Sequence, residues 1–157
     1  MVCRLLGPVG SHEATKNTED TKSMADVELL ARRAIERGLF VHRELGPGLL
    51  ESVYEAVLAT GLAREGFHVE RQKLVPMTFE GITYAESFRL DLVIEGALII
   101  EVKSTERNLP VYSKQLLTYL RLTEQPVGLL MNFGYPTFRE GLKRVVNGPA
   151  DLKASTA

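Results

Sequence analysis

The sequence predicts a single α/β domain in which helices cover a mixed central sheet, and three observations predict it. Apolar residues recur at helical spacing up to residue 66, and the pattern then changes to period-two segments between residues 68 and 104. A third helical segment and a continuous apolar strand follow. With 157 residues, 45% of them hydrophobic, the chain can bury one sizeable core without disulfides or structural metals.

Two helices are expected in the first third of the chain. The first opens at Ser23 and Asp26, which are spaced like a capping box, and ends near Glu44, where a Gly-Pro-Gly sequence follows. The second runs from about Leu49 to Gly66 and carries an apolar stripe. Both helices have one apolar side, so we expect both to pack on a sheet.

Most of the remaining elements are strands. Pro76 interrupts the early strand region and favours an edge position for it. The last segment is ambiguous between helix and strand, and we favour a strand. The expected strands are residues 68–72, 73–79, 88–94, 98–104, 127–133 and 138–146, with a third helix at 112–123 between the fourth and fifth.

The ends of the chain differ from its middle in composition. Residues 10–23 are polar and contain no Val, Ile, Leu or aromatic side chain. We therefore expect residues 1–23 to form a flexible extension, residues 24–147 to form the folded domain and residues 148–157 to form a frayed tail.

Composition excludes several classes of protein. A net charge of −1 argues against a polybasic binder that is held to nucleic acid by its overall charge. The only cysteine, Cys3, excludes a disulfide framework within the chain and a thiolate zinc cluster. No apolar run reaches the roughly 18 residues that span a bilayer. We expect a cytoplasmic protein with no membrane contact.

The most informative feature is a charged hairpin. If residues 95–97 form a three-residue loop, Asp91 lies opposite Glu101, and their Cβ atoms are about 5 Å apart on one face. Lys103 shares this face with Glu101 because side chains alternate along a strand. A two-residue loop would instead place the two carboxylates on opposite faces.

The charged residues of the hairpin have apolar neighbours. Val93 and Ile99 flank them on their own face, and the opposite face is apolar through Leu90, Leu92, Ile100 and Val102. Charges in such surroundings are costly unless they are paired or bind a metal. Two carboxylates can share a hard cation such as Mg²⁺. The alternative is a salt bridge between Lys103 and a carboxylate on a solvated face.

These residues resemble a known signature. Arg89-Leu90-Asp91 followed by Glu101-Val102-Lys103 is similar to the PD-(D/E)XK nuclease motif, although the leading proline is absent. Residues 48–54, Gly-Leu-Leu-Glu-Ser-Val-Tyr, fit the pattern of the GxxExxY protein family. With residues 42–47 and 132–134, this resemblance covers residues 42–146 and extends back through the first helix. It implies a restriction-endonuclease-like fold.

The resemblance also implies roles. Glu51, Asp91 and Glu101 would bind the metal, with the backbone carbonyl of Val102 as a further ligand, and Lys103 would orient or activate the attacking water. The expected metal is Mg²⁺, with Mn²⁺ as the substitute. The alternative for Glu51 is a solvated acid that is stabilised by the helix dipole. Tyr54 is expected to be a core residue, and Glu55 is expected to be a solvated acid or one that supports the site.

The third helix adds a second partial motif. Gln115 and Tyr119 are four residues apart and share a helix face, which resembles the Q-x-x-x-Y motif of the RecB and lambda-exonuclease branch. There the glutamine helps to build the site and the tyrosine lies near DNA. The alternative is an ordinary amphipathic edge. Arg89 and Lys114 are the basic residues that we expect to contact nucleic acid.

The function expected from this resemblance is metal-dependent hydrolysis of phosphodiester bonds in nucleic acid, with DNA as the favoured substrate. Attack by water and departure of the 3′ oxygen would leave a 5′ phosphate. Two alternatives stay open: a catalytically inactive module of the same fold that binds nucleic acid or protein, and a structural subunit whose hairpin charges only pair with each other. A homodimer is also open.

Overall fold

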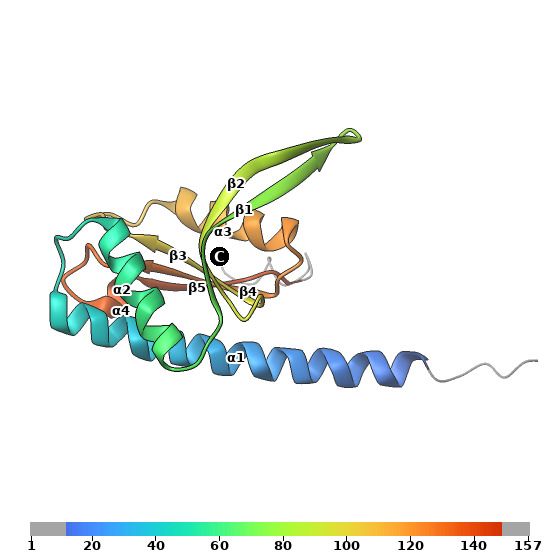
Figure 1. The fold of residues 1–157 in the computed structure, drawn as a ribbon, viewed down its shortest axis with the longest axis horizontal. Coiled ribbons are helices and arrows are strands. Elements are labelled where there is room, and N and C mark those ends of the chain that lie inside the picture. The colour runs from blue at the N-terminus through green and yellow to red at the C-terminus, as the bar shows by residue number, and fades with distance from the viewer. Residues whose placement is uncertain (1–11, 149–157) are drawn as a thin grey trace, which may run out of the picture.

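A mixed five-stranded sheet carries helices on both faces in the computed structural model of the chain, which describes residues 12–148 (Figure 1). The strand order is β1-β2-β3-β4-β5; β3 and β4 are parallel and the other neighbours are antiparallel. The elements are α1 (His12–Leu45), α2 (Glu51–Arg64), β1 (Val69–Phe79), β2 (Ile82–Ile94), β3 (Leu98–Lys103), α3 (Pro110–Leu122), β4 (Val127–Asn132), α4 (Phe138–Gly141) and β5 (Leu142–Val146). The fold is the α/β, restriction-endonuclease-like arrangement that the sequence predicted.

Each face of the sheet has its own apolar core. Helices α1 and α2 pack on one face, and α3 packs on the other (Figure 1). Strands β3 and β4 lie between both layers, so all their residues are buried except the half-buried Lys103. This position explains the continuous apolar sequence of β4, because a strand covered on both faces has no solvent side.

The first helix is longer than predicted. It begins at His12 rather than near Ser23, so Ser23 and Asp26 lie inside the helix and do not cap it. The segment from His12 to Ser23 lacks the apolar spacing that marks a packed helix, but it also lacks Gly and Pro and is compatible with helical backbone. In Figure 1 this part of α1 runs past the sheet. Residues 1–11 and 149–157 of the predicted terminal segments lie outside the described part.

Three strands precede α3, where the sequence predicted four. β1 is one strand that passes through Pro76 with a register shift between Val75 and Met77, and it is an edge strand, as Pro76 indicated. β2 begins at Ile82 rather than at Phe88. Residues 82–87 are all exposed, so no alternation of burial could mark them. The distal parts of β1 and β2, on either side of the turn at residues 80–81, project from the body of the molecule as a hairpin arm (Figure 1).

The ambiguous last segment contains both kinds of element. A short helix, α4, is closed at its start by a capping box between Thr137 and Glu140. The favoured strand follows as β5 from Leu142 and pairs antiparallel with β4. None of the helices in the described part of the chain is long and apolar enough to cross a bilayer.

Candidate active site

The register of the β2–β3 hairpin is the one that a three-residue loop predicts. Ile94 pairs with Leu98, Val93 with Ile99 and Leu92 with Ile100. The loop turns through positive φ at Glu95, and the next residue, Gly96, also has positive φ. Asp91 and Glu101 therefore follow the last regular pairs, at the point where the two strands separate.

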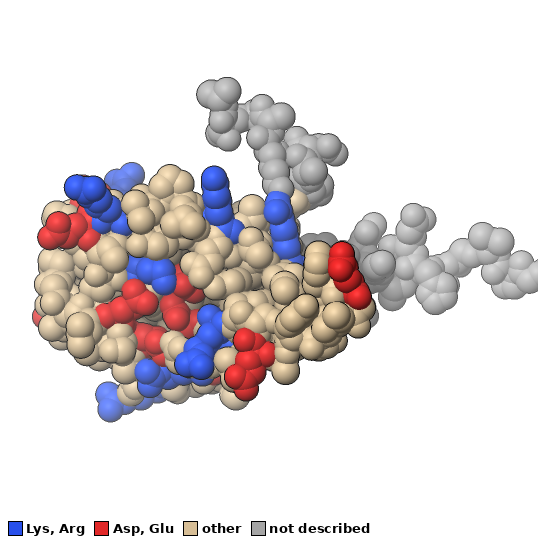
Figure 2. All heavy atoms as spheres, turned by 90° about the horizontal axis from the view of Figure 1, so that it is seen from above, with Lys and Arg blue, Asp and Glu red and all other residues tan. Residues whose placement is uncertain are grey.

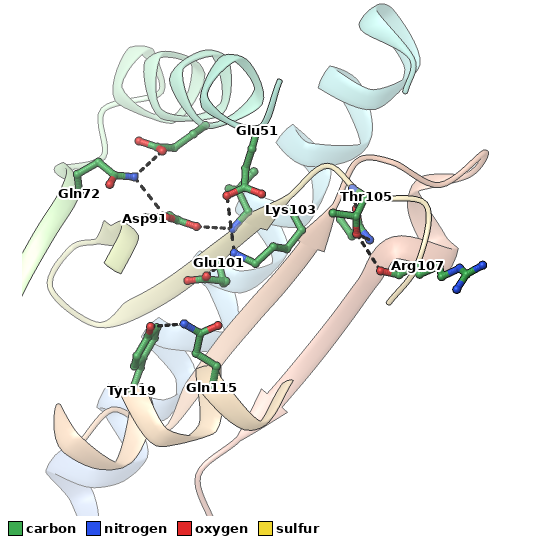
Figure 3. A network of polar contacts seen from close by, with 12 residues as sticks. Glu51, Gln72, Asp91, Glu101, Lys103, Thr105, Arg107, Gln115 and Tyr119 are labelled. Atoms are coloured by element: carbon green, nitrogen blue, oxygen red, sulfur yellow. Dashed lines mark hydrogen bonds and ion pairs between the residues drawn. The ribbon is translucent and has the colours of Figure 1, made fainter. Parts of the chain in front are cut away.

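At this point the Asp91 side chain takes the place of a backbone acceptor in the hydrogen bonding between β2 and β3. Its Oδ2 atom accepts a hydrogen bond from the backbone N–H of Val102 at 2.9 Å (Figure 3). A carboxylate bound in this way has one oxygen fixed against β3. The site thus begins where main-chain pairing ends, and a side chain takes over one of its hydrogen bonds.

Leu90 does not lie where alternation predicted. It packs with Val93 and Ile99 on the α3 face, and not with Leu92 on the opposite face. The face that β2 presents therefore changes at Asp91, between Leu90 and Leu92. This change is a local backbone irregularity, which a strict two-residue period cannot express.

The charged residues that were predicted from the sequence lie close together. The Lys103 ammonium nitrogen lies 2.6 Å from Oε1 of Glu101 and 3.7 Å from Oε1 of Glu51 (Figure 3). The Lys103 side chain is only 14% exposed and that of Glu101 only 5%. Three elements bring the group together: α2 supplies Glu51, β2 supplies Asp91, and β3 supplies Glu101 and Lys103.

Burial and mutual repulsion shift the protonation of these groups. Burial raises the pKa of Glu101 to about 7, and the charge of Asp91 adds to this rise, while Lys103 opposes it. Burial is also the first cause that raises the pKa of Asp91 and of Glu51. Burial would lower the pKa of Lys103, but its hydrogen bond to Glu101 and the surrounding carboxylates together raise it. The site therefore favours bound protons and other positive charges.

One atom of the site is unsatisfied. Oε2 of Glu101 is buried and has no hydrogen-bond partner. A buried carboxylate oxygen without a partner is costly, and a cation that prefers oxygen ligands would relieve the cost. The donor set of Glu51, Asp91 and Glu101 fits such an ion chemically. Within residues 12–148, however, no three His, Cys, Asp or Glu side chains are grouped closely enough to form a ready metal site. Lys103 lies among the carboxylates and pairs with Glu101 and Glu51.

The loop before α2 is held in place by Tyr54. Its ring stacks on Phe133 with centroids 4.5 Å apart, and it is fully buried. Its hydroxyl donates to the carbonyl of Gly46 and accepts from the N–H of Leu49 at 3.1 Å. These bonds determine where α2 begins, and hence where Glu51, its first residue, lies. Tyr54 is a core residue, as expected, and it supports the position of the acid.

Gln115 and Tyr119 share a face of α3, as predicted. They hydrogen-bond to each other, with Gln115 Nε2 as the donor (Figure 3). The Tyr119 ring stacks on Phe88 at 4.7 Å and is buried. Burial raises the pKa of Tyr119, and the charge of Glu101 contributes to the rise. The pair therefore lies next to the acidic group, although neither side chain bonds to a carboxylate.

The two predicted basic contacts are on the surface. Arg89 on β2 and Lys114 on α3 are exposed, and neither forms an ion pair with any residue in the described part of the chain. On the face shown in Figure 2, acidic side chains gather in a hollow, and Lys and Arg side chains lie around it. An acidic centre with separated basic groups at its margin can receive a phosphate chain despite the net charge of −1.

A polar group above Asp91 was not predicted from the sequence. Glu55 is buried and accepts hydrogen bonds from Arg71 Nε at 2.9 Å and from Gln72 Nε2 at 2.6 Å. Gln72 Nε2 also lies 3.2 Å from Oδ1 of Asp91 (Figure 3). The sequence indicated only that Glu55 was a solvated or supporting acid. Its spacing of four residues from Glu51 was the available signal, because it places both acids on one helix face.

A second network holds the loop that follows β3. The fully buried Asn132 accepts hydrogen bonds from the N–H groups of Thr105 at 3.0 Å and Gly134 at 3.1 Å, and donates to Asn108 at 3.1 Å. A hollow of about 530 Å³ opens beside this loop, next to the start of α2. It is lined by residues 47–50, 104–106 and 134. Space for a ligand thus adjoins the acidic group.

Comparison with known proteins agrees with this geometry. No curated protein and no solved structure matches the chain significantly. The family model described as the PD-(D/E)XK nuclease superfamily matches residues 28–145, which include every site residue described above. The narrower resemblance to the GxxExxY family stays a prediction. From the hairpin carboxylates, the lysine beside them and this match over most of its length, the chain belongs to the PD-(D/E)XK nuclease superfamily.

Proposed function

We propose that the protein is a metal-dependent nuclease that hydrolyses phosphodiester bonds of DNA. The observation that supports this most strongly is the placement of Lys103 among Glu51, Asp91 and Glu101 at the point where the β2–β3 ladder opens. A half-buried lysine surrounded by acids, beside an unsatisfied carboxylate oxygen, suits the binding of a cation and a phosphate together.

Glu51, Asp91 and Glu101 would hold the ion, with the carbonyl of Val102 as a fourth ligand, and Mg²⁺ is the favoured metal with Mn²⁺ as a substitute. When bound, this ion would polarise the scissile phosphate and lower the pKa of a water molecule. The ligands are oxygen atoms, which Mg²⁺ and Mn²⁺ prefer.

Lys103 has the catalytic role in this proposal. Its ammonium group is buried enough to act in a low dielectric, and it can donate to the attacking oxygen or to a phosphate oxygen as negative charge develops there. In the hydrolysis itself, a bond forms between the water oxygen and phosphorus, and the bond to the 3′ oxygen breaks. The products are a 5′ phosphate and a 3′ hydroxyl.

The residues around the acidic centre would hold the substrate. Arg89 and Lys114 are exposed and unpaired within the described residues, so both can bind phosphate groups. Gln115 would help to build the site, and Tyr119 can offer only its hydroxyl, because its ring is buried against Phe88. We keep residues 24–147 as the proposed nuclease domain, acting in the cytoplasm, and a homodimer as the proposed way to engage two strands.

One observation favours a second candidate, a catalytically inactive module of this fold that binds nucleic acid or protein. Within residues 12–148, the acids are not grouped as a ready metal site, and Lys103 neutralises part of their charge. In such a module the ion pairs of Lys103 would be purely structural. The two candidates differ in whether the acids bind a divalent cation.

Metal titration and cleavage assays separate the two candidates. Purified wild type is titrated with Mn²⁺ by calorimetry and incubated with labelled single-stranded and duplex DNA and RNA. The nuclease proposal requires Mn²⁺ binding and cleavage, both weakened in Asp91→Ala and Glu101→Ala. Glu86→Ala serves as the control, because Glu86 is an exposed acid on the outer part of β2 and forms no ion pair with any residue in the described part of the chain. Wild type that binds no metal and cuts no substrate would contradict the proposal.

A further inference from the structure

Gln72 has an unusual backbone conformation for its position. It lies in the middle of β1 with φ of 51°, in the left-handed region that side chains other than glycine rarely adopt. Three other described residues that are not glycine have positive φ, namely Glu80, Glu95 and Glu124, and all three lie in turns. Within the described strands, Gln72 alone has this conformation, and strain of this kind concentrates at functional sites.

The conformation interrupts the sheet opposite Asp91. Arg71 pairs with Leu92 and Lys73 pairs with Leu90, but Gln72 and Asp91, which lie between these pairs, do not pair through the backbone. The ladder keeps the same register on both sides of the interruption. The left-handed conformation therefore takes Gln72 out of the backbone ladder without shifting the register of the strands. Its side chain is then available for contacts with neighbouring residues.

The freed side chain connects two carboxylates. Gln72 Nε2 lies 2.6 Å from Oε2 of Glu55 and 3.2 Å from Oδ1 of Asp91 (Figure 3). A side-chain amide nitrogen carries two hydrogens, so one group can donate to both acids. A glutamine in this position lowers the repulsion between the two carboxylates and fixes the distance between them.

Glu55 holds the Gln72 side chain from the side opposite Asp91. Its side chain is only 6% exposed, and its other oxygen, Oε1, is bound by Arg71 at 2.9 Å. Both oxygens of Glu55 are thus occupied, which leaves it no free role in chemistry. Because it is buried on α2 and held by Arg71, Glu55 gives Gln72 a rigid point from which to hold Asp91.

The consequence is seen at Asp91. Its Oδ2 is held by the Val102 N–H at 2.9 Å, and its Oδ1 is held by Gln72. A carboxylate that is bound at both oxygens cannot rotate freely about its last torsion. The remaining lone pairs are therefore directed in a fixed plane beside Glu101 and Lys103.

We propose that Gln72 is a positioning residue that sets the orientation of the Asp91 carboxylate for metal binding, with Glu55 and Arg71 as its support. This inference rests on the proposed function of the site. Groups that orient metal ligands typically change metal affinity by 10–100-fold when they are removed. The hydrogen bonds of the Gln72 side chain to Glu55 and Asp91 offset part of the cost of its strained backbone.

Two substitutions at this position separate positioning from stability. Gln72→Gly removes the amide and relieves the positive φ, whereas Gln72→Met removes the amide, keeps the length of the side chain and retains the strain. Thr78→Gly on the exposed arm of the same strand is the control for placing glycine in β1. Mn²⁺ affinity is measured by calorimetry, and folding is checked by circular dichroism and thermal unfolding.

We expect Mn²⁺ affinity to fall about 10-fold or more in both Gln72 variants and to stay unchanged in Thr78→Gly. Excess Mn²⁺ should restore cleavage in Gln72→Gly but not in Lys103→Met, because only the first variant has a defect in metal binding. If Gln72→Met fails to fold, Gln72→Gly still decides the question.

Wild-type affinity in both folded Gln72 variants would overturn this inference and leave the proposed function intact. A wild type that binds no Mn²⁺ would overturn both together. Loss of affinity in the Thr78→Gly control as well would overturn the positioning role, because the effect would then follow from a weakened β1.

Discussion

The ammonium group of Lys103 lies 2.6 Å from Oε1 of Glu101, while Oε2 of the same carboxylate is buried without a hydrogen-bond partner. Oε1 of Glu101 is thus paired with a lysine of its own strand, and Oε2 is left to accept a ligand. The relationship explains how a site with three acids can stay folded before a cation binds, and it leads to the predictions below.

Removal of the lysine should separate binding from chemistry. Lys103→Met keeps most of the aliphatic chain but removes the ammonium group, so cleavage should fall by about 10²–10³-fold or more. Mn²⁺ affinity should be kept or increased, because a positive charge leaves the metal site. Single-turnover cleavage and calorimetry measure the two effects. Cleavage at the wild-type rate would exclude Lys103 from the chemistry.

Stability without metal should depend on pH through Glu101. Its pKa is raised from 4.5 to about 7, so the folded protein binds the proton more tightly than the unfolded chain. The stabilisation from the protonated acid is present below pH 4.5 and is lost as the pH rises towards 7. Glu101→Gln removes the titrating carboxyl group, so the variant should not lose stability in this way as the pH rises. In EDTA, we expect the variant to exceed wild type by about 2–3 kcal/mol at pH 8.

The comparison at low pH is the internal control for this prediction. At pH 4, both chains carry an uncharged side chain at position 101, so their free energies of unfolding in urea should converge. A difference between wild type and Glu101→Gln that stays constant across the whole pH range would show that Glu101 does not titrate near neutrality.

Metal should stabilise the folded protein. A ligand that binds only the folded state adds about 2.7 kcal/mol at a concentration 100 times its Kd. We expect Mg²⁺ to raise the Tm of wild type at pH 8 and to have little effect on Asp91→Ala. The same Tm shift in both proteins would place the bound cation elsewhere.

The buried Asn132 should contribute stability through the loop beside the site. Asn132→Ala removes the acceptor of the Thr105 and Gly134 N–H groups and leaves them unsatisfied. We expect a loss of about 2–4 kcal/mol in urea unfolding. Thr83→Ala on the exposed arm is the control, and it should stay within about 1 kcal/mol of wild type. Equal effects of the two changes would show that the Asn132 network is not needed to hold the loop.

Much of the site could be predicted from the sequence because it depends on short-range geometry. A three-residue loop at residues 95–97 determines the β2–β3 register, and this register brings Asp91 and Glu101 together. The spacing of four residues likewise joins Gln115 and Tyr119. In each case the residues are neighbours along a hairpin or on a helix face, so periodicity alone indicates their contact.

The rest depends on features that periodicity does not encode. The left-handed backbone of Gln72 and the change of face at Leu90 are local departures from strand geometry. The contact between Gln72 and Glu55 joins two elements whose distance is set by tertiary packing. The start of α1 at His12 was missed for another reason, since residues 12–23 carry no apolar stripe that would indicate a helix.

Cleavage of end-labelled DNA in the presence of Mg²⁺ tests the central claim most directly, with wild type, Glu101→Ala and Lys103→Met prepared side by side. The site as described predicts cleavage by wild type that leaves 5′ phosphates and stops in EDTA, with neither variant active above background. Cleavage that survives in Lys103→Met or persists in EDTA would contradict it, because the activity would then arise outside the group formed by Glu51, Asp91, Glu101 and Lys103.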